Sequence, residues 1–70
     1  MLLKNFLNVV SGDTMVNVYI HGNYIGRLTA REILLGRAIN YFMLATDLRT
    51  AEVKKAYIKV EKTPALCIEL

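Results

Sequence analysis

The chain has 70 residues, of which 54% are hydrophobic, and it carries a formal net charge of +3. A core of this size contributes only about 3 to 5 kcal/mol of stability unless a disulfide, a metal or a partner subunit adds to it. One cysteine, Cys67, excludes an intramolecular disulfide, and one histidine, His21, leaves too few ligands for a zinc site within one chain. We therefore expect a single domain over residues 1–70, without metal or cofactor, that forms a homo-oligomer.

Two features of the sequence bear on its location in the cell. The N-terminal stretch 1–10 is interrupted by Lys4, Asn5 and Asn8, and no small-residue cleavage site follows it. The longest apolar stretch, 39–45, is far shorter than the roughly 20 residues that a membrane-spanning helix needs. We expect a cytoplasmic protein with no membrane partner.

The charges are distributed unevenly along the chain. Residues 1–26 hold only Lys4 and Asp13, whereas residues 27–62 hold eight basic and four acidic residues. This imbalance favours anionic partners, but a net charge of +3 is equally compatible with a soluble protein that binds none.

Two helices are expected from the apolar spacing. Residues 2–10 have apolar side chains at helical intervals, and the turn-forming cluster 11–13 ends that helix. Thr29 and Glu32 form a capping box, in which each side chain bonds the backbone N–H of the other residue. The second helix should begin there and continue to Ala45.

The second helix has two apolar rows instead of one. One row can cover the domain's own sheet, and the other must meet either a partner subunit or the opening helix. Gly36 also offers a point at which the helix divides. We favour a partner subunit, with an interface formed by Leu35, Ile39, Tyr41, Phe42 and Met43.

Alternating apolar and polar residues predict two hairpins. Residues 16–21 alternate with the period of a half-buried strand, Gly22 and Asn23 tolerate the positive φ of a tight turn, and 24–28 form the return strand. The segment 53–60 fits both a helix and a strand. We favour a strand, because β-branched and aromatic residues gather at its end.

A turn at 62–64 leads from this strand into the alternating residues 66–70, which complete the second hairpin. The expected fold is therefore α+β, with a short N-terminal helix, two antiparallel β-hairpins forming a small sheet, and one central helix packed on it.

Three short patterns give the chain a resemblance. They are the turn Gly12-Asp13-Thr14, the run Glu52-Val53-Lys54-Lys55-Ala56-Tyr57 and the closing Ile68-Glu69-Leu70. In these patterns and in the order of its elements, the chain resembles a group of short orphan proteins of Firmicutes and their phages. The similarity spans nearly the whole chain and implies an accessory gene of a mobile element, without an assigned activity.

The side chains that catalysis requires are sparse. Cys67 lies between two apolar residues and is interpreted as structural, and His21 is expected at a hairpin tip. Gly22 to Gly26 lacks the Lys-Ser/Thr of a phosphate-binding loop, and the carboxylates are scattered. We expect no enzymatic activity.

One face of the expected sheet combines aromatic and basic residues. Tyrosines beside lysines can stack on a base while the ammonium groups neutralise a phosphate. Tyrosine and lysine are also common on the solvent-exposed face of a sheet that binds no ligand, where lysine protects against edge pairing. The residues of this face are Asn17, Tyr19, Lys55, Tyr57 and Lys59.

The start of the central helix, beside Arg27 and Arg31, is a second candidate anion site, where Glu32 competes for the same N–H groups. The ligand-binding residues expected from both sites and the hairpin tip are Tyr19, His21, Arg27, Arg31, Lys55, Tyr57 and Lys59.

Three hypotheses follow. In the first, an oligomer sequesters a small anionic, nucleotide-like ligand. In the second, the protein is an inhibitor or adaptor that binds a host protein through the central helix or a strand edge. In the third, it binds nucleic acid weakly through the Tyr and Lys face.

Overall fold

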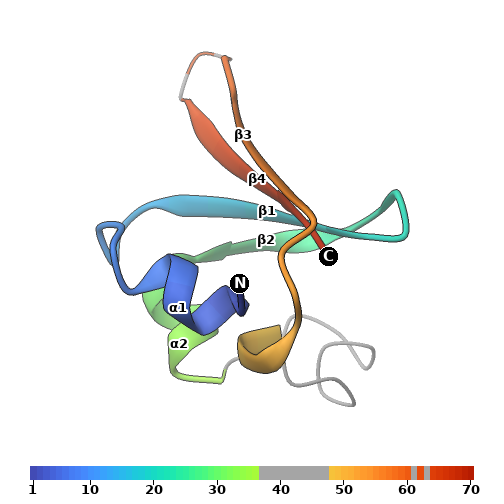
Figure 1. Cartoon of the computed structure of the whole chain (residues 1–70). Coiled ribbons are helices and arrows are strands. Elements are labelled where there is room, and N and C mark those ends of the chain that lie inside the picture. The colour runs from blue at the N-terminus through green and yellow to red at the C-terminus, as the bar shows by residue number, and fades with distance from the viewer. Residues whose placement is uncertain (37–47, 61, 63) are drawn as a thin grey trace.

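A computed structural model describes residues 1–36, 48–60, 62 and 64–70 of the chain. Within these residues, four strands form one sheet, and the helices lie together on one side of it (Figure 1). The α+β class predicted from the sequence is confirmed. The elements are α1 (Leu3–Leu7), β1 (Met15–Ile20), β2 (Asn23–Thr29), α2 (Ala30–Leu34), the 3-10 helix η1 (Leu48–Thr50), β3 (Lys55–Lys59) and β4 (Ala65–Glu69).

The sheet has the strand order β2-β1-β4-β3. Both predicted hairpins are confirmed, because β1 pairs with β2 and β3 pairs with β4 in antiparallel fashion. The ambiguous segment 53–60 therefore contains a strand, as we favoured. The two hairpins are joined by a parallel pairing of β1 with β4, in which Asn17 lies opposite Cys67. The sequence did not predict this parallel contact.

The turn of the first hairpin lies one residue earlier than predicted. Ile20 pairs with Asn23, so His21 and Gly22 alone form the loop, with φ values of 51° and 81°. Two-residue hairpin loops favour type I′ turns, which need a positive φ at both central positions. Asn23, which we expected in the turn, is instead the first residue of β2.

The core lies between the sheet and the helices. Alternate residues of the two central strands point toward it and are buried, among them Val16, Val18 and Ile68. Leu3 and Leu7 of α1 pack against them from the helical side, and burying each such side chain contributes roughly 1.5 to 3 kcal/mol. The remaining buried members of this cluster are Leu28, Ala30, Ile33, Leu48, Leu66 and Leu70.

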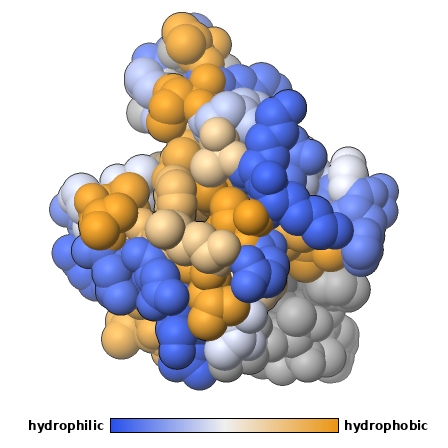
Figure 2. Space-filling model, viewed as in Figure 1, coloured by the Kyte–Doolittle hydropathy of each residue, from blue (hydrophilic) through white to orange (hydrophobic). Residues whose placement is uncertain are grey.

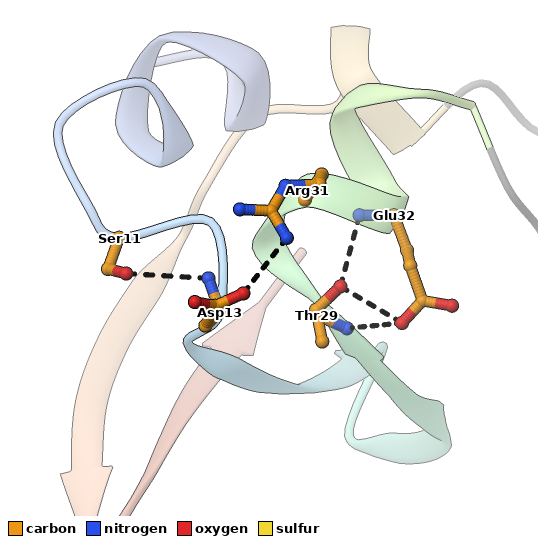
Figure 3. Close-up of polar contacts among 5 residues, drawn as sticks. All are labelled: Ser11, Asp13, Thr29, Arg31 and Glu32. Carbon is orange, nitrogen blue, oxygen red and sulfur yellow. Dashed lines mark hydrogen bonds and ion pairs between the residues drawn. The ribbon is translucent and has the colours of Figure 1, made fainter.

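The predicted capping box begins α2 (Figure 3). The Thr29 hydroxyl oxygen accepts from the Glu32 backbone N–H at 3.2 Å, and Glu32 Oε1 accepts from the Thr29 backbone N–H at 3.0 Å. The same Oε1 also accepts from the Thr29 hydroxyl at 2.9 Å. The local sequence therefore determined this helix start correctly.

Both helices are shorter than predicted. α1 ends at Leu7, and α2 ends at Leu34 because Gly36 adopts a left-handed φ of 81°, which stops the helix. The helix therefore does divide at Gly36, which the sequence offered as a break point, and the remainder of the predicted helix to Ala45 lies outside the described residues. None of the described helices has the length and apolarity required to cross a membrane.

Candidate functional site

Alternation along the strands gives the sheet a second face, opposite α1, α2 and η1, which we call the distal face. Because Val16, Val18 and Ile68 point into the core, their neighbours along β1 and β4 point the other way. Strand register then places β2 and β3 residues beside them. The distal face carries Tyr24, Arg27, Asn17, Tyr19, Cys67, Glu69, Lys55, Tyr57 and Lys59.

A row of four residues crosses the whole distal face. Arg27 pairs with Asn17, Asn17 with Cys67, and Cys67 with Tyr57, one residue from each strand. Arg27 Nε donates to Asn17 Oδ1 at 2.8 Å, and Asn17 Nδ2 lies 3.7 Å from Cys67 Sγ as a weak donor. The Asn17 side chain is 4% exposed, so its amide needs these two partners.

A second row lies two residues further along the strands. Tyr19 pairs with Tyr24 on one side and with Glu69 on the other, and Glu69 pairs with Lys55. The rings of Tyr19 and Tyr24 meet edge to face, with centroids 5.5 Å apart. This aromatic pair therefore lies directly beside a carboxylate, with a lysine one strand further away.

The surroundings of Tyr57 shift the pKa of its phenol. Partial burial raises the pKa of its phenol above the ordinary value of 10.0, and the neighbouring Cys67 and Glu69 raise it further. The Lys55 ammonium lies 5.3 Å from the centre of the Tyr57 ring, which is within the range of a cation–π contact. Tyr57 is therefore protonated at neutral pH and presents an exposed aromatic ring beside a positive charge.

The structure brings together five of the seven predicted ligand-binding residues on the distal face. They are Tyr19, Arg27, Lys55, Tyr57 and Lys59. The whole predicted aromatic and basic face, including Asn17, is therefore present as a single surface, although its role stays a prediction.

Two predicted site residues lie elsewhere. His21 occupies the tip of the first hairpin, where its positive φ serves the turn. Arg31 lies on α2 and donates to the Asp13 carboxylate at 2.9 Å (Figure 3). Arg27 and Arg31 lie on opposite sides of the sheet, and the Glu32 carboxylate accepts from the Thr29 N–H at the helix start. An anion site at the helix start stays a prediction.

Three residues of the distal face were missed as site residues. Cys67 and Glu69 alternate with the buried residues of β4, and that alternation was visible in the sequence. Their place in the middle of the face depends on the parallel pairing of β4 with β1, which has no local signal. Tyr24 was missed because the register shift next to Tyr19 breaks the alternation between Arg27 and Tyr24, so that both residues face the same side although they are three positions apart.

Metal-binding and nucleophilic arrangements are not found in the part of the chain that the structure describes. No group of three or more His, Cys, Asp or Glu side chains is placed there to hold a metal ion. The Cys67 thiol is fully buried opposite Asn17, whereas His21 lies at the hairpin tip, about 13 Å further along β1. Thiol and imidazole therefore do not meet, although β1 and β4 are neighbours.

The predicted subunit interface falls mainly on residues that the structure does not describe. Ile39, Tyr41, Phe42 and Met43 lie outside the described ranges. Leu35 is described, and its exposed fraction of 69% leaves its side chain available to a partner. The homo-oligomer stays a prediction.

No protein family, curated protein or solved structure matches this chain. The resemblance to short phage and Firmicutes proteins stays a prediction.

Proposed function

We propose that this protein is a non-enzymatic binding protein whose distal face holds a nucleotide unit, an aromatic base with its phosphate. The observation that carries the proposal is the strand register, which groups Tyr19, Tyr24 and Tyr57 with Arg27 and Lys55 on one face. The unit can be a free nucleotide or part of a single strand, because both present the same chemistry.

Tyr19 is the natural stacking platform. It lies on a central strand, and Tyr24 supports its ring edge to face, which limits the rotamers that binding must restrict. Stacking of a base on an aromatic side chain contributes about 1 to 3 kcal/mol and tolerates every base. Glu69, directly beside Tyr19, can accept hydrogen bonds from an exocyclic amino group.

The phosphate is directed toward Arg27 rather than across the sheet. From Tyr19, the Cα of Arg27 lies about 8 Å away, one strand over and two residues along, whereas that of Lys55 lies about 10 Å away beyond Glu69. The Glu69 carboxylate repels an anion on that second path. Arg27 is exposed and donates from Nε to Asn17, and the two terminal nitrogens of the guanidinium provide further N–H donors for a phosphate.

The proposal is tested by titrating the protein with AMP and with a fluorescein-labelled single-stranded hexanucleotide, following amide NMR shifts and anisotropy respectively. Saturable binding with shifts on β1, β2 and β4 is expected for at least one probe. Binding of AMP alone indicates a free nucleotide, and much tighter binding of the strand indicates nucleic acid. If neither probe saturates at millimolar concentration, the proposal is rejected.

Matched variants separate the distal face from general charge. Arg27→Gln and Arg31→Gln each remove one positive charge, but only Arg27 lies on the distal face. Arg27→Gln should weaken binding and lower the slope of log K against log salt by about 1, whereas Arg31→Gln should change neither. Tyr19→Leu should weaken binding about 5- to 100-fold through lost stacking. Equal effects of the two arginine variants would contradict the proposed site.

A further inference from the structure

The outer edge of β3 is a second feature of the molecule, and the proposed nucleotide site does not explain it. In the described residues β3 has a strand neighbour, β4, on one side only. All five residues of β3 are exposed, whereas β4 beside it is almost entirely buried. An edge of this kind leaves a row of backbone N–H and C=O groups available for pairing with another strand.

The two faces of β3 differ in chemistry. On the core-side face, Ile58 and the adjoining Val60 are 59% and 85% exposed. The β3–β4 hairpin projects beyond the helical layer, and hydrophobic surface covers part of its projecting end (Figures 1 and 2). On the distal face, Lys55 and Lys59 flank Tyr57. An incoming strand therefore meets apolar side chains on one face and ammonium groups on the other.

The charge of the whole chain is concentrated here. Residues 54–62 hold four lysines and one glutamate, which equals the chain's entire net charge of +3, so the other residues sum to zero. The described lysines of this segment are all exposed. Edge lysines commonly prevent strands from pairing with copies of themselves. An acidic partner strand converts the same charges into an attraction.

We propose that β3 is a docking site for an extended segment of another protein in which acidic and apolar side chains alternate. Paired with β3, such a segment places its carboxylates beside Lys55 and Lys59 and its apolar side chains beside Ile58 and Val60. Backbone hydrogen bonds supply affinity, and the alternation supplies specificity.

A second copy of this chain is a poorer occupant. Antiparallel pairing of β3 with β3 centred on Tyr57 places Lys55 opposite Lys59 of the other copy, and like charges that face each other directly are destabilising. The other edge strand, β2, carries Arg27 on the same face and no acidic residue. Neither described edge of the sheet complements β3.

The test uses a nine-residue peptide that alternates Glu with Val, added to the full chain labelled for amide NMR. Its matched control replaces every Glu by Lys. The Glu peptide should bind with shifts centred on β3 and β4, and the Lys peptide should bind at least about tenfold more weakly, because two attractive contacts become repulsive. Raising the salt concentration should lower the affinity of the Glu peptide for the protein and should not lower that of the Lys peptide.

Variants distinguish this site from the proposed nucleotide site. Ile58→Thr retains a β-branched side chain and removes exposed apolar surface, so it should keep the fold and weaken peptide binding about threefold or more. Tyr19→Leu should leave the affinity for the peptide unchanged and lower only the affinity for the nucleotide. A peptide N-methylated at alternate residues on its β3-facing edge should lose binding, because it cannot donate to the strand.

Several results would overturn the docking proposal. They are the absence of binding by the Glu peptide at millimolar concentration, equal affinity of the Glu and Lys peptides, and shifts that map to β2. Broadening of β3 signals with protein concentration in the absence of peptide would identify a second copy as the occupant instead.

Discussion

The hydrogen bond between Arg27 and Asn17 offers the most direct test of how the distal face is organised. The donor and acceptor atoms, Arg27 Nε and Asn17 Oδ1, lie 2.8 Å apart, and the Asn17 side chain is buried. A hydrogen bond to a charged group contributes about 1.5 to 3 kcal/mol, but Arg27 is exposed and water replaces part of that contribution. We expect a coupling free energy of about 1 kcal/mol between the two side chains.

The measurement is a double-mutant cycle with Asn17→Ala, Arg27→Ala and the combined variant, followed by urea unfolding. With an m-value of about 1 kcal/mol/M for a chain of this size, the coupling corresponds to a shift in midpoint of about 1 M. Asn17→Ala should lower the free energy of unfolding more than Arg27→Ala does, because it also leaves Cys67 without its hydrogen-bond partner and creates a small cavity.

The ion pair between Asp13 and Arg31 provides the control cycle. Its atoms lie 2.9 Å apart, almost the same distance, but both side chains are exposed. Exposed pairs contribute about 0 to 1 kcal/mol, and we expect less than about 0.5 kcal/mol here. If the coupling of Asn17 with Arg27 is no larger than that of Asp13 with Arg31, burial of the asparagine does not strengthen the bond and the reasoning is refuted.

Four other predictions concern single residues. Gly22→Ala should lower the free energy of unfolding by about 1 to 2 kcal/mol in thermal melts, because φ is 81° there although no atom blocks a Cβ; an unchanged melting temperature would contradict the turn assignment. Thr29→Ala should cost about 1 kcal/mol in urea unfolding through loss of the cap, and a neutral effect would argue against the capping box. Because the pKa of Tyr57 is raised in the folded state, its phenol ionises at lower pH in the unfolded chain, and the free energy of unfolding should fall as the pH rises above about 10. In Tyr57→Phe, this fall in stability with pH, followed by circular dichroism, should be shallower. The buried Cys67 thiol should react with a disulfide reagent only at the rate of unfolding, and rapid labelling of the native protein would show that it is accessible.

Local patterns predicted much of the fold. The capping box at Thr29, the first hairpin and the closing strand each depend on residues near one another in the sequence, and each is present. The error in the turn of the first hairpin is also local. The hairpin turn includes His21 because Ile20 pairs with Asn23, which leaves His21 and Gly22 as the loop. The end of α2 before Gly36 agrees with the break point that the sequence offered, because Gly36 takes a left-handed conformation.

Where a strand is regular, the sequence alone determined which of its side chains share a face, since alternation along one strand needs no knowledge of the neighbours; the register shift beside Tyr24 is the exception. It placed Tyr19, Lys55 and Tyr57 opposite the core. Only the tertiary structure decided that β4 inserts between β1 and β3, which places Cys67 and Glu69 in the middle of the face and leaves β3 at an edge. Strand order depends on contacts between residues about 50 positions apart, such as Asn17 with Cys67, and pairing across that separation has no signature within either segment.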